Sequence, residues 1–123
     1  MIEVVRVSEK AKTQLITLKR RTGIKNWNIL CRWAFCVSIA EKSDPPYEDI
    51  PSDSSIEMSW KTFSGSEDEI YLALIQLSVS KAGHLLNKEN VNKYFRLHLH
   101  RGISYLVSNP SMNKIEDLIR LTC

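Results

Sequence analysis

The sequence contains no long uninterrupted hydrophobic run and no leader-like N-terminus, and both absences limit where the chain can function. No stretch of about 18 uncharged apolar residues occurs, so we expect no membrane-spanning helix. The first ten residues, MIEVVRVSEK, lack the apolar core and the small-residue cleavage site of a signal peptide. We therefore expect a cytoplasmic protein with no membrane partner.

Familiar catalytic and metal-binding motifs are also absent. The three cysteines are an odd number, and Cys31 and Cys36 lie inside an apolar segment, as is typical of reduced core thiols rather than of a disulfide framework. Their C-x4-C spacing differs from that of the paired ligands in structural zinc sites. The sequence has no P-loop, dinucleotide-binding fingerprint or nucleophile elbow. We predict that the chain is not an enzyme and that it uses no catalytic residue, metal or cofactor.

What the sequence does have is an uneven distribution of charge. Its 123 residues suffice for one domain with a modest core, which we predict to span residues 1–123. Residues 1–40 carry eight Lys and Arg against two acids, residues 41–69 have a net charge of −7, and residues 70–123 have a net charge of +4. A basic end beside an acidic middle indicates a surface for a polyanion.

Hydrophobic periodicity predicts a short strand and then a helix at the N-terminus. The β-branched run IEVVRV is typical of a strand. Apolar residues at helical spacing predict a helix over residues 10–21, with Ser8 as its N-cap and Gly23 as its left-handed stop.

A second helix is predicted from Asn26 or Asn28 to about residue 41, and it is apolar nearly all round. A lone small domain cannot easily cover such a helix, so we expect burial between subunits. The residues assigned to this interface are Trp27, Leu30, Trp33 and Phe35.

The rest of the chain is predicted to be a Pro-rich acidic loop, residues 43–55, and a helical part, residues 56–123. IEMSW alternates like one short extra strand. Helices are predicted within residues 64–83 and over residues 88–107, with a last short helix around Ile115, Leu118 and Ile119. The fold class is therefore mainly α.

The alternating histidines of FRLHLHRG could share a metal only on a strand. On the predicted helix His98 and His100 diverge by about 200°, so we predict no metal site. His98 is expected to be a hydrogen-bonded core residue, and His100 is expected to line a positive surface with Arg96 and Arg101.

The order strand, helix, glycine turn and helix resembles the ribbon-helix-helix family. The resemblance lies in VVRVSEKAKTQLITLKRRTGIKNWNILCRWAF. It implies that the N-terminal strands of two chains pair into a ribbon, with Val7 facing inward and Arg6, Val4 and Ile2 facing outward. One function left open is accordingly that of a ribbon-helix-helix transcriptional regulator.

The whole chain resembles the DndE family of the bacterial DNA phosphorothioate modification system. The resemblance lies in SEKAKTQLITLKRRTGIKNWNILCRWAFC, in the acidic loop and in YFRLHLHRGISYL. It implies a small, mostly helical homotetramer that binds duplex DNA, preferentially nicked, and works with sulfur-transfer and ATPase subunits. A protein-interaction adaptor of the same complex remains the alternative.

The cations that end the first helix have two interpretations. The helix dipole favours Lys19, Arg20 and Arg21 there by about 0.3–1 kcal/mol each, so a solvated helix end explains any one of them. Taken together and repeated in an oligomer, they could neutralise several phosphates. Gly23 would let the backbone of the turn come close to a phosphate, although this glycine also serves as the helix stop. The predicted DNA-binding residues are Lys12, Lys19, Arg20, Arg21, Gly23 and Lys25.

Overall fold

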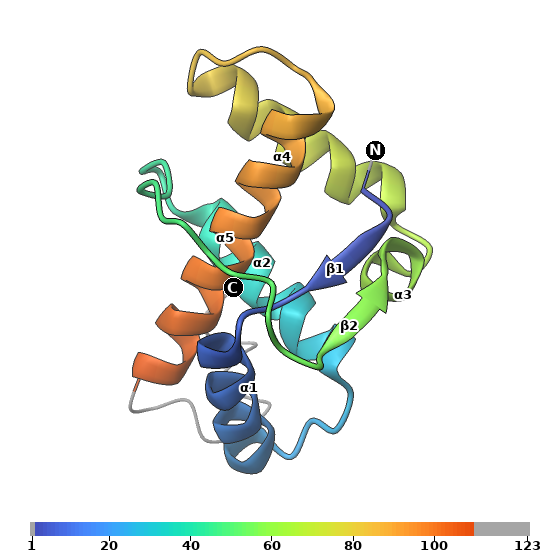
Figure 1. The fold of residues 1–123 in the computed structure, drawn as a ribbon, viewed down its shortest axis with the longest axis vertical. Coiled ribbons are helices and arrows are strands. Elements are labelled where there is room, and N and C mark those ends of the chain that lie inside the picture. The colour runs from blue at the N-terminus through green and yellow to red at the C-terminus, as the bar shows by residue number, and fades with distance from the viewer. Residues whose placement is uncertain (1, 110–123) are drawn as a thin grey trace.

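The structure, a computed structural model, describes residues 2–109. The helices and strands of this part confirm a mainly α fold with one small antiparallel sheet (Figure 1). Their bounds are β1 Val4–Arg6, α1 Glu9–Thr22, α2 Trp27–Ala40, β2 Glu57–Ser59, α3 Trp60–Ser64, α4 Asp68–Lys81 and α5 Lys88–Ser108. The helix predicted around Ile115, Leu118 and Ile119 lies outside the described residues. No helix within residues 2–109 is long and apolar enough to cross a membrane.

The capping residues predicted from the sequence lie at the ends of α1 and at the start of α5. The Ser8 hydroxyl accepts a hydrogen bond from the Ala11 amide at 3.1 Å and so caps α1. Gly23 ends α1 with φ of 76°, a left-handed conformation that favours glycine. The Asn87 side chain accepts from the Asn90 amide at 2.8 Å and caps α5.

Strand β1 pairs with β2 of the same chain, with Val4 opposite Ser59. The ribbon of the ribbon-helix-helix family is instead formed between two chains, so the strand pairing differs from what that resemblance implies. The inward position of Val7 is confirmed, because its side chain is fully buried. Ile2 is also buried, which corrects the expectation that it faces outward with Arg6.

Helix α2 lies at the centre of the molecule and packs mainly against α5 (Figure 1). Leu30 and Phe35 are both 0% exposed within the single chain. They therefore have no surface to offer a second subunit, which corrects their assignment to an interface. Trp27 and Trp33 are half-buried and keep some surface. The apolar character of α2 thus reflects burial by neighbouring helices of its own chain.

Gly102 of α5 marks the place where α5 and α2 come closest. A Cβ at this position would lie 1.8 Å from the Ala34 carbonyl oxygen. The α2–α5 packing therefore requires glycine at this point.

An aromatic cluster joins α2, α3, α4 and α5. Phe63 of α3 lies against Phe95 with a centroid distance of 5.1 Å, and against Phe35 at 6.0 Å. Trp60 stacks on Phe63 at 5.4 Å. The sequence did not predict the five-residue α3, because IEMSW reads as a strand through Trp60. In the structure Ser59 ends β2, and its hydroxyl caps α3 by accepting from the Thr62 amide.

Candidate nucleic-acid interface

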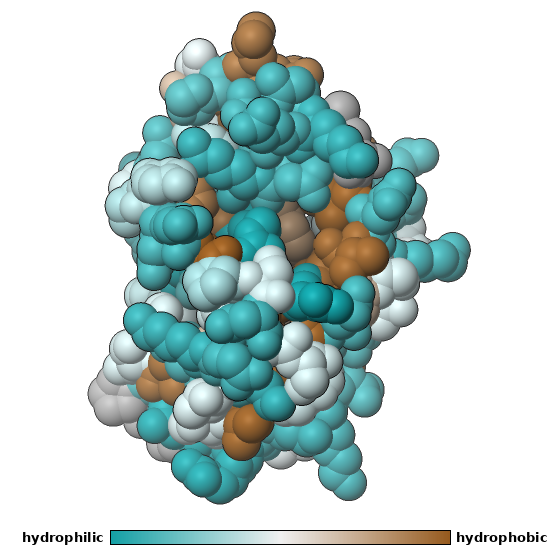
Figure 2. Space-filling view, in the orientation of Figure 1, coloured by the Kyte–Doolittle hydropathy of each residue, from teal (hydrophilic) through white to brown (hydrophobic). Residues whose placement is uncertain are grey.

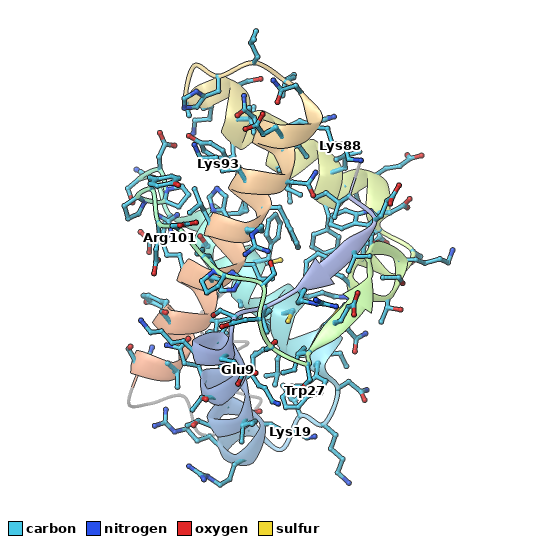
Figure 3. All side chains as sticks on the ribbon, in the orientation of Figure 1. Glu9, Lys19, Trp27, Lys88, Lys93 and Arg101 are labelled. Atoms are coloured by element: carbon cyan, nitrogen blue, oxygen red, sulfur yellow. The ribbon has the colours of Figure 1, made fainter. Side chains whose placement is uncertain are left out.

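The basic end of α1 and the turn after it form one exposed edge, at the bottom of the view in Figure 3. Arg20 and Lys25 are exposed, and neither side chain makes a hydrogen bond or ion pair with another residue of the described part of the chain. The Lys19 ammonium lies 4.5 Å from the centroid of the Trp27 ring. This cation–π contact fixes the direction of the side chain without neutralising its charge.

Gly23 lies in the middle of this edge and leaves open space around itself. No atom comes within 4 Å of the position that a Cβ would occupy. Its amide donates to the Lys19 carbonyl at 3.0 Å, and the Ile24 amide donates to the Thr22 hydroxyl at 3.2 Å. These two turn amides are therefore occupied, and positive charge on the edge comes from side chains. We call Lys19, Arg20, Gly23 and Lys25 the basic rim.

Two of the predicted DNA-binding residues are not part of this rim. The Arg21 guanidinium donates to the Val107 carbonyl at 2.8 Å and thereby holds the end of α1 to the end of α5. Lys12 lies two turns before Lys19, about 10 Å along the helix, and donates to the Ser55 hydroxyl at 2.7 Å. The structure thus brings together four of the six predicted residues.

Most other arginines hold the chain together. The Arg32 guanidinium donates to the carbonyls of Phe63 and Thr62 and so fastens α3 to α2. Arg96 donates to the Ile50 carbonyl and the Ser52 hydroxyl. Arg101 joins α5 to Ser38 and Ser43, which lie in and just after α2. These arginine hydrogen bonds cannot be predicted from the sequence, because the carbonyl groups that accept them are distant in the chain.

The two histidines of α5 are both internal. His98 is 3% exposed and lies between two hydroxyls, with Ser38 Oγ 2.8 Å from Nδ1 and Ser78 Oγ 2.7 Å from Nε2. Burial, with the nearby Arg101 guanidinium, lowers the pKa of His98 to about 4. The ring is therefore neutral at pH 7, and the expectation of a hydrogen-bonded core residue is confirmed.

His100 differs from its predicted place on a positive surface. It is 8% exposed, and its Nε2 accepts from the Ser8 amide at 3.2 Å. Its Nδ1 then carries the proton and donates to the Arg96 carbonyl at 2.8 Å. Burial lowers its pKa below the ordinary value. Among residues 2–109 no group of three His, Cys, Asp or Glu side chains is placed to hold a metal ion.

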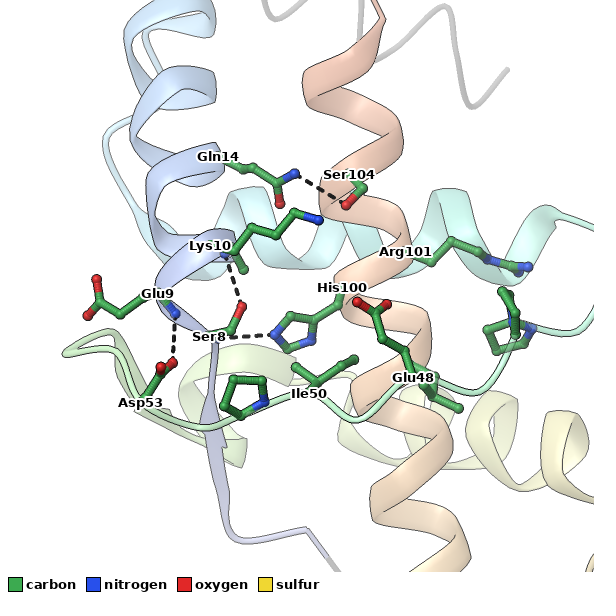
Figure 4. Close-up of a pocket in the computed structure, with 15 residues that line it drawn as sticks. Ser8, Glu9, Lys10, Gln14, Glu48, Ile50, Asp53, His100, Arg101 and Ser104 are labelled. Carbon is green, nitrogen blue, oxygen red and sulfur yellow. Dashed lines mark hydrogen bonds between the residues drawn. The ribbon is translucent and has the colours of Figure 1, made fainter.

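A cleft of about 460 Å³ lies between the start of α1, the acidic loop and α5 (Figure 4). Its apolar lining includes Leu97, Ile50 and three loop prolines. Glu48 and Lys10 extend over it from opposite walls in Figure 4. The Asp53 carboxylate accepts from the Glu9 amide at 2.8 Å, so the N-terminus of α1 already holds an anionic group.

The loop wall of this cleft is anchored at several points. Arg96 and Arg101 hold the loop to α5 and α2 as described above. The Ser54 hydroxyl and amide both donate to the Val7 carbonyl, at 2.7 and 3.3 Å. The cleft is therefore a preformed surface, separate from the basic rim, whose charged lining residues are of both signs: Glu9, Glu48 and Asp53 with Lys10 and Arg101.

Comparisons with known proteins agree with this fold. A family model described as "DNA sulphur modification protein DndE" matches residues 4–114. The crystal structure of DndE from Escherichia coli B7A, involved in DNA phosphorothioation modification, superposes with a TM-score of 0.70 at 23% identity, covering 86% of this chain and 98% of that chain. A DndE mutant with two glycines replaced by lysine, involved in DNA phosphorothioation, gives a TM-score of 0.69 at 20% identity, covering 89% and 100%. No curated protein matches. Since the family model spans most of its length, the chain belongs to the DndE family of DNA sulphur modification proteins.

Proposed function

We propose that the chain is a non-catalytic, cytoplasmic DNA-binding subunit of the DNA phosphorothioate modification machinery. It binds duplex DNA, preferentially nicked, through phosphate contacts of the basic rim, and it does so as a homotetramer. Its partners are the sulfur-transfer and ATPase subunits of the system. Membership of the DndE family supports the place in this system, while the nick preference and the tetramer rest on the resemblance to that family.

The observation that carries the proposal is that the charges of the basic rim are available. Lys19, Arg20 and Lys25 have no acidic partner in the described residues, where the one ion pair is Arg6–Glu57 at 2.6 Å. The nearby Arg21 guanidinium, by contrast, is already engaged in a hydrogen bond to the Val107 carbonyl. Free cations grouped beside an open turn are suited to contact phosphates without reading bases.

The test is a gel-shift titration of the triple variant Lys19→Glu, Arg20→Glu and Lys25→Glu. The basic rim of each subunit loses three cations and gains three anions, so we expect the affinity for nicked duplex DNA to fall at least tenfold. If all three residues contact phosphates, the salt slope of log K should flatten by about 2.7 per rim, or about 0.9 per contact. Intact and single-stranded DNA, each at two salt concentrations, complete the series.

The matched control is Lys42→Glu, Lys61→Glu and Lys88→Glu. These exposed lysines lie on other elements, and their reversal changes the net charge by the same amount. Affinity should stay within about twofold of the unchanged chain. Equal losses in the two triple variants, with folding intact by circular dichroism, would show that net charge rather than the basic rim governs binding.

The cleft beside the acidic loop favours a second function, that of a protein-interaction adaptor. Apolar side chains line it together with charges of both signs, which are Glu9, Glu48 and Asp53 and the cations Lys10 and Arg101. Its apolar lining and its charges of both signs suit a segment of a partner protein that carries apolar and charged side chains. An isolated chain that shifts none of the three DNAs would support this function over the first.

A further inference from the structure

Helix α4 carries an apolar stripe that nothing in the described chain covers. Ile70 and Leu77 are 57% and 58% exposed, and Ala73 between them is also exposed. These positions are three and four residues apart, so they share one face of the helix. The opposite face holds Ile75 and Val79, which are fully buried against the core.

The stripe matches the same stripe of a second copy when the two helices run in opposite directions. Ala73 lies midway between the two large side chains, where a small residue allows a second helix to approach closely. Acids occupy the N-terminal end of α4, at Glu67, Asp68 and Glu69, and Lys81 occupies the last turn. In an antiparallel pair of α4 helices, apolar side chains would meet apolar side chains and acids would approach lysines.

We propose that α4 packs antiparallel against α4 of a second copy of this chain, about a two-fold axis that passes beside Ala73. Ile70 then lies opposite the partner's Leu77, and the acids of the first turn approach the partner's Lys81. This interface belongs to the homo-oligomer of the proposed function and gives it a defined contact surface. The symmetry of the stripe selects a second copy over an unrelated partner, because both its apolar and its charged positions repeat about one centre.

The position of α4 in the molecule is compatible with this pairing. It lies at the opposite end of the long axis from the basic rim (Figure 1), so pairing leaves both rims exposed. The turn that follows α4 adds Leu85 and Leu86, which are 77% and 52% exposed. Figure 2 shows apolar atoms projecting at this end of the molecule.

Disulfide cross-linking of an Ala73→Cys variant tests the two-fold axis directly. A residue beside the axis meets its own copy, so this variant should form a covalent dimer on mild oxidation. Ser80→Cys is the matched control: it is exposed on the same face, but its two copies would lie about 21 Å apart along antiparallel helices. Both variants are made in a chain with Cys36→Ser and Cys123→Ser. Equal cross-linking of the two, or none at Ala73→Cys, would overturn the proposal.

Light scattering of a Leu77→Glu variant tests the interface without cross-linking. Its molar mass should fall to half of the value for the unchanged chain. Ile16→Glu, which places the same change on an exposed apolar residue of α1, should leave the mass unchanged. A Leu77→Glu protein that keeps the full mass contradicts the α4 interface but not the oligomer. An unchanged chain that is monomeric at micromolar concentration contradicts both.

Discussion

At the scale of residues, the cations of this protein divide into two groups that the sequence does not distinguish. Arg21, Arg32, Arg96 and Arg101 all direct guanidinium groups at backbone carbonyls. A planar guanidinium has five donors and can satisfy several oxygens at once, which suits it to this role. The rim residues Lys19, Arg20 and Lys25 make no such bonds, and their charge remains available to a ligand.

Replacing His98 with Gln should flatten the acid side of the stability curve. The folded pKa is about 4 and the unfolded pKa about 6.5, so between these values the unfolded chain binds more protons. Stability from the neutral ring is therefore fully present above about pH 6.5. It is lost as the pH falls toward 4, by up to about 3 kcal/mol in the unchanged chain.

Urea unfolding at pH 7.5, 5.5 and 4.5 measures this difference. His98→Gln should lower stability at pH 7.5, because Ser38 and Ser78 lose part of their pairing, yet it should lose less than the unchanged chain on acidification. The exposed His84→Gln serves as the control. Parallel pH profiles for the His98→Gln and unchanged chains would disprove this account of the buried ring.

The sequence predicted residue roles well where the signal was local. Ser8 and Gly23 were assigned correctly because a cap depends on neighbours within one turn. His98 was assigned correctly because it falls on the apolar stripe of its helix. His100 was misplaced because its partner, the Ser8 amide, is 92 residues away in the chain.

At the scale of elements, α2 shows that a sequence can predict that a helix is buried but not which neighbouring element buries it. A helix that is apolar all round must be covered, but the pattern does not say by what. In the structure α5, α1 and α3 cover it, and Leu30 and Phe35 belong to the chain's own core. The unpartnered apolar surface is instead on α4, whose residues were predicted only to form a helix.

Gly102→Ala tests the close contact of α2 with α5. In an open helix this change would add about 1 kcal/mol of stability, because alanine is the better helix former. Here the new Cβ would lie 1.8 Å from the Ala34 carbonyl oxygen, so the helices must move apart. We expect a loss of about 3 kcal/mol or more in the free energy of unfolding.

Chemical denaturation measures this loss, with Ser108→Ala on the same helix as the control. Ser108 is exposed at the end of α5, and its replacement should change stability by less than about 0.5 kcal/mol. An increase in stability for Gly102→Ala would mean that α2 and α5 are not in such close contact.

At the scale of the whole molecule, three surfaces of different chemistry occupy different places. The basic rim lies at one end of the long axis, α4 lies at the other, and the cleft beside the acidic loop lies between them, at the start of α1 and along α5. The charge blocks of the sequence indicated a basic surface, and the rim does lie within the first block, but Lys10 of the same block lines the cleft together with Glu48 of the acidic block. The apolar surface needed the fold, since only packing shows which apolar residues are left uncovered.

If the chain assembles and binds DNA as proposed, this separation predicts how the two are coupled. A variant with Ile70→Glu and Leu77→Glu should be half the size of the unchanged oligomer, yet each rim should remain intact, because α4 lies far from it. Its affinity for nicked duplex should then fall through lost multivalency, with fewer phosphates contacted per particle. The salt slope should fall in proportion to the number of rims that one DNA molecule engages.

Gel shifts at four salt concentrations measure that slope for the double variant and for the unchanged chain. The same measurement on the rim variant with Lys19→Glu, Arg20→Glu and Lys25→Glu separates the two effects, since that protein should keep its mass and lose its binding. A double variant that binds no DNA at any salt concentration while remaining folded would place the DNA surface across the α4 interface. The basic rim could then not be the complete binding site, because loss of a distant contact would have removed it.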